Sequence, residues 1–360
     1  MTMTSARCRP LARLLAALVV LAPALGMAGG WVEDWRRSHP RWQGVHLILR
    51  TPEAAAELES RLPDLARAGA NVLIVEVNYN FAYDSHPELR DATVIDKARA
   101  ASLARACRRL NLRLIPQFSC LGHQSWAEHT FPLLTRYPEL DETPGQFPGN
   151  KDIYCRSWCP RHPRVLEIVL PMLDELLNAF DADALHVGMD EVFLLASEHC
   201  GRCRGANPAE LFAKAVTDLH THLVTRRGRE MLMWADRLLD AQATGYGEWE
   251  AARNGTHPAV DLIPRDIILC DWHYEPLARY PGKPADYLSV PHLLGKGFRV
   301  WPAGWKNVEA VQALAESSRR HATERMLGYL VTTWGAVKVA DLAEWPPLRV
   351  GFAAPARQEP

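Results

Sequence analysis

The feature that most constrains the fold is a series of short apolar runs that alternate with amphipathic stretches. These runs are nearly continuous in apolar residues, as in Val72–Val75, which is typical of parallel strands covered on both faces. The eight runs are Gly44–Arg50, Asn71–Val77, Leu112–Phe118, Ala184–Asp190, Met231–Asp236, Asp266–His273, Phe298–Pro302 and Met326–Thr333. Eight strands that alternate with helices predict a single (β/α)8 barrel, a TIM barrel of the α/β class.

The stretches between the runs have the apolar spacing of helices, and several open with proline, which is common at the first helical turn. These predicted helices are Pro52–Arg67, Lys97–Leu110, Pro163–Phe180, Pro208–Arg226 and Val308–Arg320. A doubly wound open sheet is the alternative, but no glycine-rich fingerprint opens the first βα unit. We expect one domain, with a lead-in over residues 29–43, the barrel over residues 44–350 and a tail over residues 351–360.

The charge balance argues against a nucleic-acid partner. Lys and Arg together number 41, against 42 for Asp and Glu, so there is no basic surplus to bind phosphates or an anionic membrane surface.

Residues 1–28 have the order of a secretory signal peptide. Arg7, Arg9 and Arg13 precede the apolar run Leu14–Ala22, and small residues follow up to Ala28. The apolar run is too short to span a bilayer, and no later segment approaches 18 consecutive apolar residues. We therefore expect cleavage near Ala28, export to the periplasm or the medium, and no stable membrane span afterwards; an uncleaved anchor is the alternative.

Export changes how the cysteines are interpreted. After loss of Cys8, seven remain, so at least one stays unpaired. The close pairs Cys155/Cys159 and Cys200/Cys203 fit either disulfides, free thiols or one structural zinc bound by four thiolates, and no catalytic metal is expected. The long segment Leu121–Arg161, which contains the first pair, is too long for an ordinary loop and is interpreted as functional.

Polar side chains gather at the predicted C-terminal strand ends, where such barrels carry their chemistry. Arg50 ends the first strand, and His123 follows the third. The fourth strand contains His186 and ends in Asp190 and Glu191. We take the two acids as candidate catalytic residues and His186 as an interior histidine that supports them, while His123 either contacts a substrate or belongs to the scaffold.

Five of the twelve tryptophans also fall at this predicted rim. An indole combines a flat apolar face with one N–H donor, and barrel interiors are usually filled by aliphatic side chains. Five indoles at one rim therefore favour an apolar box of sugar size with acids at its floor; they are Trp234, Trp272, Trp301, Trp305 and Trp334.

These residues resemble the motifs of glycoside hydrolase family 20, the β-N-acetylhexosaminidases. The segment His186–Val192 resembles the family's His-x-Gly-Gly-Asp-Glu signature, with Met189 in place of the second glycine, and Phe118–His123 resembles its Gly-His loop. Trp234, Trp272 and Trp334 fall where the family's tryptophans line the sugar pocket. The likeness covers roughly residues 44–335 and is similar to the short branch typified by hexosaminidase D.

The resemblance implies substrate-assisted catalysis on a terminal β-linked N-acetylhexosamine, without a metal or organic cofactor. Asp190 would orient the acetamido group, whose oxygen attacks the anomeric carbon, and Glu191 would act as general acid and then as general base. Tyr274 would donate to the acetamido carbonyl, and Arg50 would bind sugar hydroxyls. The first strand lacks the Asp often found before that arginine.

Two other functions are kept as alternatives. One is a carbohydrate-binding barrel without turnover. The other is a glycosidase for a sugar that lacks the acetamido group, in which two acids from different strands, such as Glu76 and Glu191, perform double displacement.

Overall fold

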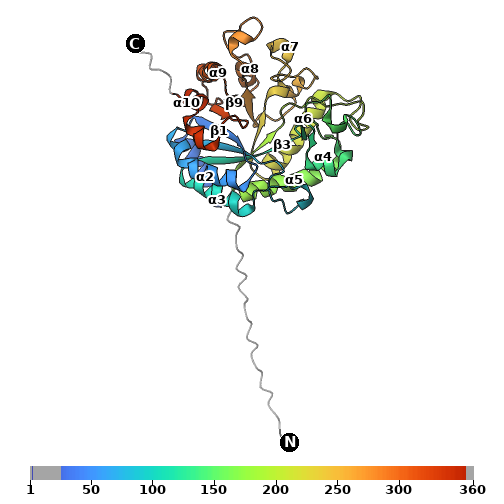
Figure 1. Ribbon diagram of the computed structural model, residues 1–360, viewed down its shortest axis with the longest axis horizontal. Coiled ribbons are helices and arrows are strands. Elements are labelled where there is room, and N and C mark those ends of the chain that lie inside the picture. The colour runs from blue at the N-terminus through green and yellow to red at the C-terminus, as the bar shows by residue number, and fades with distance from the viewer. Residues whose placement is uncertain (1, 3–25, 354–360) are drawn as a thin grey trace.

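A computed structural model of the chain describes residue 2 and residues 26–353, and its centre is a closed barrel of eight parallel strands (Figure 1). Around the barrel the strands neighbour one another in the order β1-β10-β9-β8-β7-β6-β3-β2. Their bounds are β1 Trp42–Ile48, β2 Val72–Glu76, β3 Arg113–Cys120, β6 Ala184–Gly188, β7 Glu230–Trp234, β8 Ile268–Trp272, β9 Arg299–Gly304 and β10 Gly328–Thr332. The predicted (β/α)8 barrel is confirmed, and each predicted strand overlaps an observed one.

Helices surround the barrel, and the first and last of its strands, β1 and β10, pair directly (Figure 1). A two-stranded antiparallel hairpin, β4 Ser125–Trp126 and β5 His129–Thr130, lies outside it. The helices are α1 Gly26–Ser38, α2 Pro52–Arg67, α3 Lys97–Arg109, α4 Pro132–Arg136, α5 Pro163–Ala179, α6 Pro208–His220, α7 Ala241–Thr244, α8 Ser289–Gly295, α9 Val308–Arg320 and α10 Pro346–Phe352. Among the described helices, none has the length and apolar character needed to cross a membrane.

The helix starts follow from the local sequence. Thr51 precedes Pro52 and accepts a hydrogen bond from the Ala54 backbone N–H at 3.1 Å, and Asn307 does the same for the first N–H groups of α9. Side-chain oxygens at these positions satisfy N–H groups that have no partner within the helix. Most of the predicted signal peptide, residues 3–25, and tail residues 354–360 lie outside the described part of the chain.

The N-terminal end of the barrel is filled by indole rings. Trp35 of α1 packs against Trp42 of β1, and Trp42 lies edge-on to Trp301 of β9, with ring centroids 5.7 and 5.3 Å apart. A Cβ atom at Gly44 would lie 2.2 Å from the Trp301 ring, so only glycine leaves room for it. The placement of Trp301 at the catalytic rim is therefore wrong: the third residue of β9 is still deep in the barrel, and this interior is partly aromatic.

A buried ion cluster lies beside these rings. The Arg113 guanidinium is fully buried, stacks over Trp42 and pairs with Asp183 and Glu230. Burial alone would disfavour its charge, but the two carboxylates outweigh burial and raise the pKa of Arg113. Because these three residues begin or directly precede β3, β6 and β7, the cluster ties three strands together and leaves the opposite end free for chemistry.

Candidate active site

The two acids predicted from the sequence lie just after β6, and one histidine contacts both. His123 Nε2 lies 3.2 Å from Asp190 Oδ2 and 3.1 Å from Glu191 Oε2. Asp190 is 8% exposed, and the side chains of Glu191 and His123 are 13% and 17% exposed. The structure thus brings together three predicted site residues, from the loops after β3 and β6, in a partly enclosed cluster.

Adjacent residues reach the same histidine because the backbone turns sharply after β6. Gly188, Met189 and Glu191 have φ values of 68°, 74° and 49°, in the left-handed region that non-glycine residues rarely occupy. Such backbone strain is concentrated at functional sites. Gly122 explains how the His123 loop comes so close, since a Cβ atom there would lie 2.9 Å from the Asp190 carbonyl oxygen.

His123 and Asp190 favour opposite charges in this cluster. Burial disfavours both charged forms, but the contact between the two side chains outweighs it. Asp190, with further help from Cys155 and Glu191, raises the pKa of His123 well above its ordinary value, and His123 lowers the pKa of Asp190. At neutral pH the site therefore holds an ionised Asp190 and a cationic His123.

A third acid, Asp236, hydrogen-bonds both the acid loop and the aromatic side of the site. Its Oδ2 accepts a hydrogen bond from the Glu191 backbone N–H at 2.9 Å, and its Oδ1 accepts one from Trp272 Nε1 at 3.3 Å. Burial raises the pKa of Asp236 to about 6, with the charges of Asp190 and Glu191 adding to the effect and Arg237 opposing it. Asp236 couples the position of the acid loop to that of an aromatic wall.

Aromatic residues at the ends of β8 and β10 and just after them form that wall. Trp272 and Tyr274 lie with ring centroids 4.7 Å apart and planes 30° apart, and Trp334 Nε1 donates to the Tyr274 hydroxyl at 2.6 Å. This bond uses a lone pair of the Tyr274 oxygen and not its proton; the other contact of the hydroxyl is Thr332 Oγ1 at 3.4 Å. Burial raises the pKa of Tyr274 well above its ordinary value, so the hydroxyl keeps this proton at neutral pH. Trp305 adjoins Tyr274 at 5.4 Å.

Beneath the wall, Trp234 and His186 form an interior layer. Both are fully buried, their ring centroids are 4.5 Å apart, and Trp234 lies 5.6 Å from Trp334. Burial, with a contribution from His46, lowers the pKa of His186 to about 3. His186 Nδ1 accepts a hydrogen bond from the Gly188 N–H at 3.1 Å, so the neutral ring carries its proton on Nε2. His186 thus supports the turn that precedes Asp190.

Two residues of the sequence analysis make no recorded contact with the acids among the described residues. Arg50 follows β1 and is exposed; within residues 26–353 the structure records no hydrogen bond or ion pair of its side chain. Glu76 is buried, and its carboxylate contacts His46 at 3.2 Å, Gln117 at 2.8 Å and Asn78 at 2.8 Å. Among the described residues, the Glu76 carboxylate therefore has no recorded contact with Glu191.

A second aromatic group beside Glu191 was missed. Tyr154 lies beside Glu191, and burial followed by this charged neighbour raises the pKa of the phenol well above its ordinary value. Its ring lies edge-on to Trp126, Trp249 and Phe193, with centroids 5.3, 4.7 and 5.7 Å away. Both of these indoles are open to solvent: Trp126 is 54% exposed and Trp249 is 45% exposed. The available signal was the aromatic content of the Leu121–Arg161 segment.

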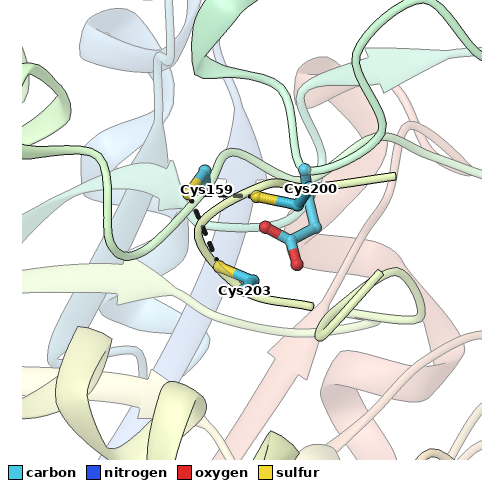
Figure 2. Close-up of side chains that lie close together, drawn as sticks. Cys159, Cys200 and Cys203 are labelled. Carbon is cyan, nitrogen blue, oxygen red and sulfur yellow. Dashed lines mark hydrogen bonds between the residues drawn. The ribbon is translucent and has the colours of Figure 1, made fainter. Parts of the chain in front are cut away.

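Of the four cysteines that the sequence analysis groups together, only three lie close to one another in the structure. Cys159 Sγ lies 3.4 Å from Cys200 Sγ and 3.5 Å from Cys203 Sγ (Figure 2). Cys155 is not part of this group: its Sγ lies 3.5 Å from the Glu191 carbonyl oxygen. The fourth residue that lies with Cys159, Cys200 and Cys203 is Glu142. The predicted set of four thiols is corrected accordingly, because the Cys155 thiol contacts the acid loop while the Cys159 thiol contacts Cys200 and Cys203.

The barrel fold is shared with known glycosidase structures. A chitobiase from Flavobacterium johnsoniae is 18% identical, with a TM-score of 0.60 over 86% of this chain and 47% of its own. A β-N-acetylhexosaminidase from Bacteroides fragilis is 12% identical, with a TM-score of 0.62 over 89% of this chain and 68% of its own. One from Streptomyces coelicolor is 14% identical, with a TM-score of 0.59, and covers 88% and 65%. At these identities the likeness establishes the fold.

This chain spans about half the length of the Flavobacterium chitobiase, and no curated protein sequence matches it. A family model does match, over most of the barrel. Residues 60–337, from α2 to just beyond β10, match the glycosyl hydrolase family 20 catalytic domain, and this stretch contains His123, Asp190 and Glu191. The predicted family is confirmed: the chain belongs to glycosyl hydrolase family 20, a family of glycoside hydrolases.

Proposed function

We propose that this glycoside hydrolase is an exo-acting β-N-acetylhexosaminidase that retains the anomeric configuration by substrate-assisted catalysis. The observation that carries the proposal is the pair Asp190 and Glu191, joined by His123 and faced by the wall of Trp272, Tyr274 and Trp334. Two carboxyl groups on adjacent residues do not flank a glycosidic bond as in conventional double displacement, in which they are about 5 Å apart across it. An internal nucleophile on the substrate removes that requirement.

Asp190 is suited to hold the acetamido group. In the proposed reaction the acetamido oxygen attacks the anomeric carbon, the glycosidic bond breaks and an oxazolinium ion forms. The positive charge that develops on the acetamido nitrogen needs a fixed anion nearby. The lowered pKa of Asp190, caused by His123 against the opposing effect of burial, keeps this carboxylate ionised in a site that is largely closed to water.

Glu191 is proposed as the general acid and base. It gives its proton to the leaving oxygen, and then accepts a proton from the water that opens the oxazolinium ion. Three groups lie against it: Asp236, which accepts a hydrogen bond from its backbone N–H, and the side chains of His123 and Tyr154. Such positioning of a proton donor is what this step requires.

The aromatic wall is proposed to bind the N-acetyl group and the terminal sugar ring. Tyr274 has a hydroxyl proton available for the acetamido carbonyl oxygen, since its own oxygen accepts from Trp334. Trp272 and Trp334 offer flat apolar faces for the methyl group and the sugar ring, with Trp234 beneath them. Trp126 and Trp249 lie with Tyr154 beside Glu191, where exposed indoles suit the departing sugar or aglycone. Arg50, at the same end of the barrel, remains a proposed contact for sugar hydroxyls.

The first 28 residues support a further part of the proposal, which is export of the chain. The order of arginines, apolar run and small residues suits a signal peptide cleaved near Ala28. The enzyme would then meet its glycan in the periplasm or the medium.

Paired aryl glycosides test the proposed function. The purified chain is expected to release phenol from aryl N-acetyl-β-glucosaminide or -galactosaminide, and none above background from the aryl β-glucoside, which has a 2-hydroxyl in place of the acetamido group. A matched background is the Asp190→Asn/Glu191→Gln double variant. Equal cleavage of the glucoside would favour conventional double displacement, and turnover of neither substrate would favour the binding barrel.

A further inference from the structure

Outside the active site, three thiols and one carboxylate lie close together in the segments that follow β3 and β6. Glu142 and Cys159 belong to the long segment between β3 and α5, and Cys200 and Cys203 belong to the segment between β6 and α6. One ligand atom from each of the four residues lies within 4.8 Å of the other three. All four residues are buried, with exposures of 0% for Glu142, 1% for Cys159, 4% for Cys200 and 0% for Cys203.

The carboxylate is the observation that points to a ligand. Glu142 Oε1 accepts a hydrogen bond from the Ser197 backbone N–H at 3.0 Å, which fixes the group toward the sulfurs. Glu142 Oε2 is buried and has no hydrogen-bond partner of ordinary geometry among the described residues. A buried carboxylate oxygen without a partner is unfavourable, and it is usually explained by a missing ion or water. Beside three thiols, a cation that prefers sulfur and oxygen would supply the missing partner.

The distances suit a tetrahedral ion. Zn–S bonds of about 2.3 Å at tetrahedral angles place two sulfurs about 3.8 Å apart. The Cys159 sulfur lies 3.4 and 3.5 Å from the other two, so a small adjustment would admit the ion. A disulfide needs about 2.05 Å, and all seven described cysteines are free.

We propose that Glu142, Cys159, Cys200 and Cys203 bind one Zn²⁺ ion in a closed, four-ligand structural site. With all four positions occupied by protein groups, the ion has no open position for substrate or water, so it stabilises rather than catalyses. It would fasten the segment that carries His123 and Tyr154 to the segment that carries Asp190 and Glu191.

Metal content of the full-length purified protein tests the proposal first. We expect one zinc per chain by elemental analysis. Replacement of the zinc by Co²⁺ is expected to give thiolate-to-metal charge transfer and the intense visible absorption of tetrahedral cobalt. Removal of the ion with a chelator is expected to lower Tm, and Zn²⁺ but not Mg²⁺ is expected to restore it, because Mg²⁺ prefers six oxygen ligands.

Matched variants identify the ligands. Glu142→Gln and Cys203→Ser are expected to lose zinc at least tenfold more readily to a competing chelator. Cys155→Ala and Cys107→Ala, which remove buried cysteines outside the cluster, are expected to keep one zinc per chain. If a ligand variant does not fold, the cobalt spectrum of the unaltered chain still decides.

Three results would overturn the proposal. One is a metal-free chain that folds with two fewer alkylatable thiols, which would indicate a disulfide as expected for an oxidising compartment. The second is a metal-free chain with all its thiols free. The third is loss of zinc from Cys155→Ala together with retention in Cys203→Ser. None of these readouts depends on hydrolytic activity, so they stand apart from the proposed function.

Discussion

Glu191→Gln is expected to reduce kcat/KM on an N-acetylhexosamine disaccharide by about 10²–10⁴-fold, the usual contribution of a general acid. A sugar alkoxide is a poor leaving group and needs the proton that glutamine cannot give. On an aryl N-acetylhexosaminide whose phenol is strongly acidic, the bond can break without protonation. The loss in the first, bond-breaking step should therefore be far smaller on the aryl substrate, and steady-state rates on both substrates measure the contrast.

The matched control for this variant is Glu198→Gln, since Glu198 lies on the same segment with its side chain 83% exposed. It is expected to behave as the unaltered chain. Thermal unfolding of both variants separates a loss of chemistry from a loss of structure. Equal loss on the two substrates, or a greater loss on the aryl substrate, would mean that Glu191 is not the proton donor.

Asp190→Asn is expected to cost roughly 10²–10³-fold in kcat on both substrates, as is typical when one preorganised electrostatic contact is removed. The reason is that Asp190 acts on the acetamido group and not on the leaving oxygen, so the quality of the leaving group does not matter. The substitution also removes the charge that raises the pKa of His123. His123 should then lose its proton at a lower pH than in the unaltered chain, which imidazole titration by NMR would follow.

Asp218→Asn is the matched control, because Asp218 lies on α6 in a salt bridge with Lys214, away from the acids. It should leave kcat unchanged on both substrates. A loss in Asp190→Asn that varies with the leaving group as in Glu191→Gln would show that the two acids have been given each other's roles. No loss in either variant would place the chemistry elsewhere in the barrel.

The barrel could be predicted because its strands have a local signal. Strands buried on both faces, such as Val72–Glu76, are nearly continuous in apolar residues, and helix starts such as Thr51-Pro52 are marked by their own side chains. The depth of a residue within a strand has no such signal. Trp301 was placed at the rim, although it lies with Trp42 at the other end, where Gly44 makes the space that admits it.

The acids of the site could be predicted, but not the contacts that organise them. Asp190 and Glu191 form a recognisable pattern at a strand end, and His123 follows a Gly-His motif. The partnership of Glu191 with Asp236 and Tyr154 depends on long-range packing of three loops, which leaves no periodicity in the sequence. For the same reason the spacing of the cysteines suggested Cys155 as a zinc ligand, whereas Glu142, 17 residues before Cys159, completes the cluster.

The measurement that tests the central claim most directly is the rate on a series of aryl glucosaminides whose N-acyl group carries zero to three fluorine atoms. Fluorine withdraws electrons from the acyl oxygen and weakens it as a nucleophile while leaving the sugar, the bond that breaks and the leaving group unchanged. If this oxygen attacks the anomeric carbon, kcat/KM should fall steadily and steeply with each added fluorine. A rate independent of fluorination would show that a protein carboxylate or water is the nucleophile, and would contradict the account.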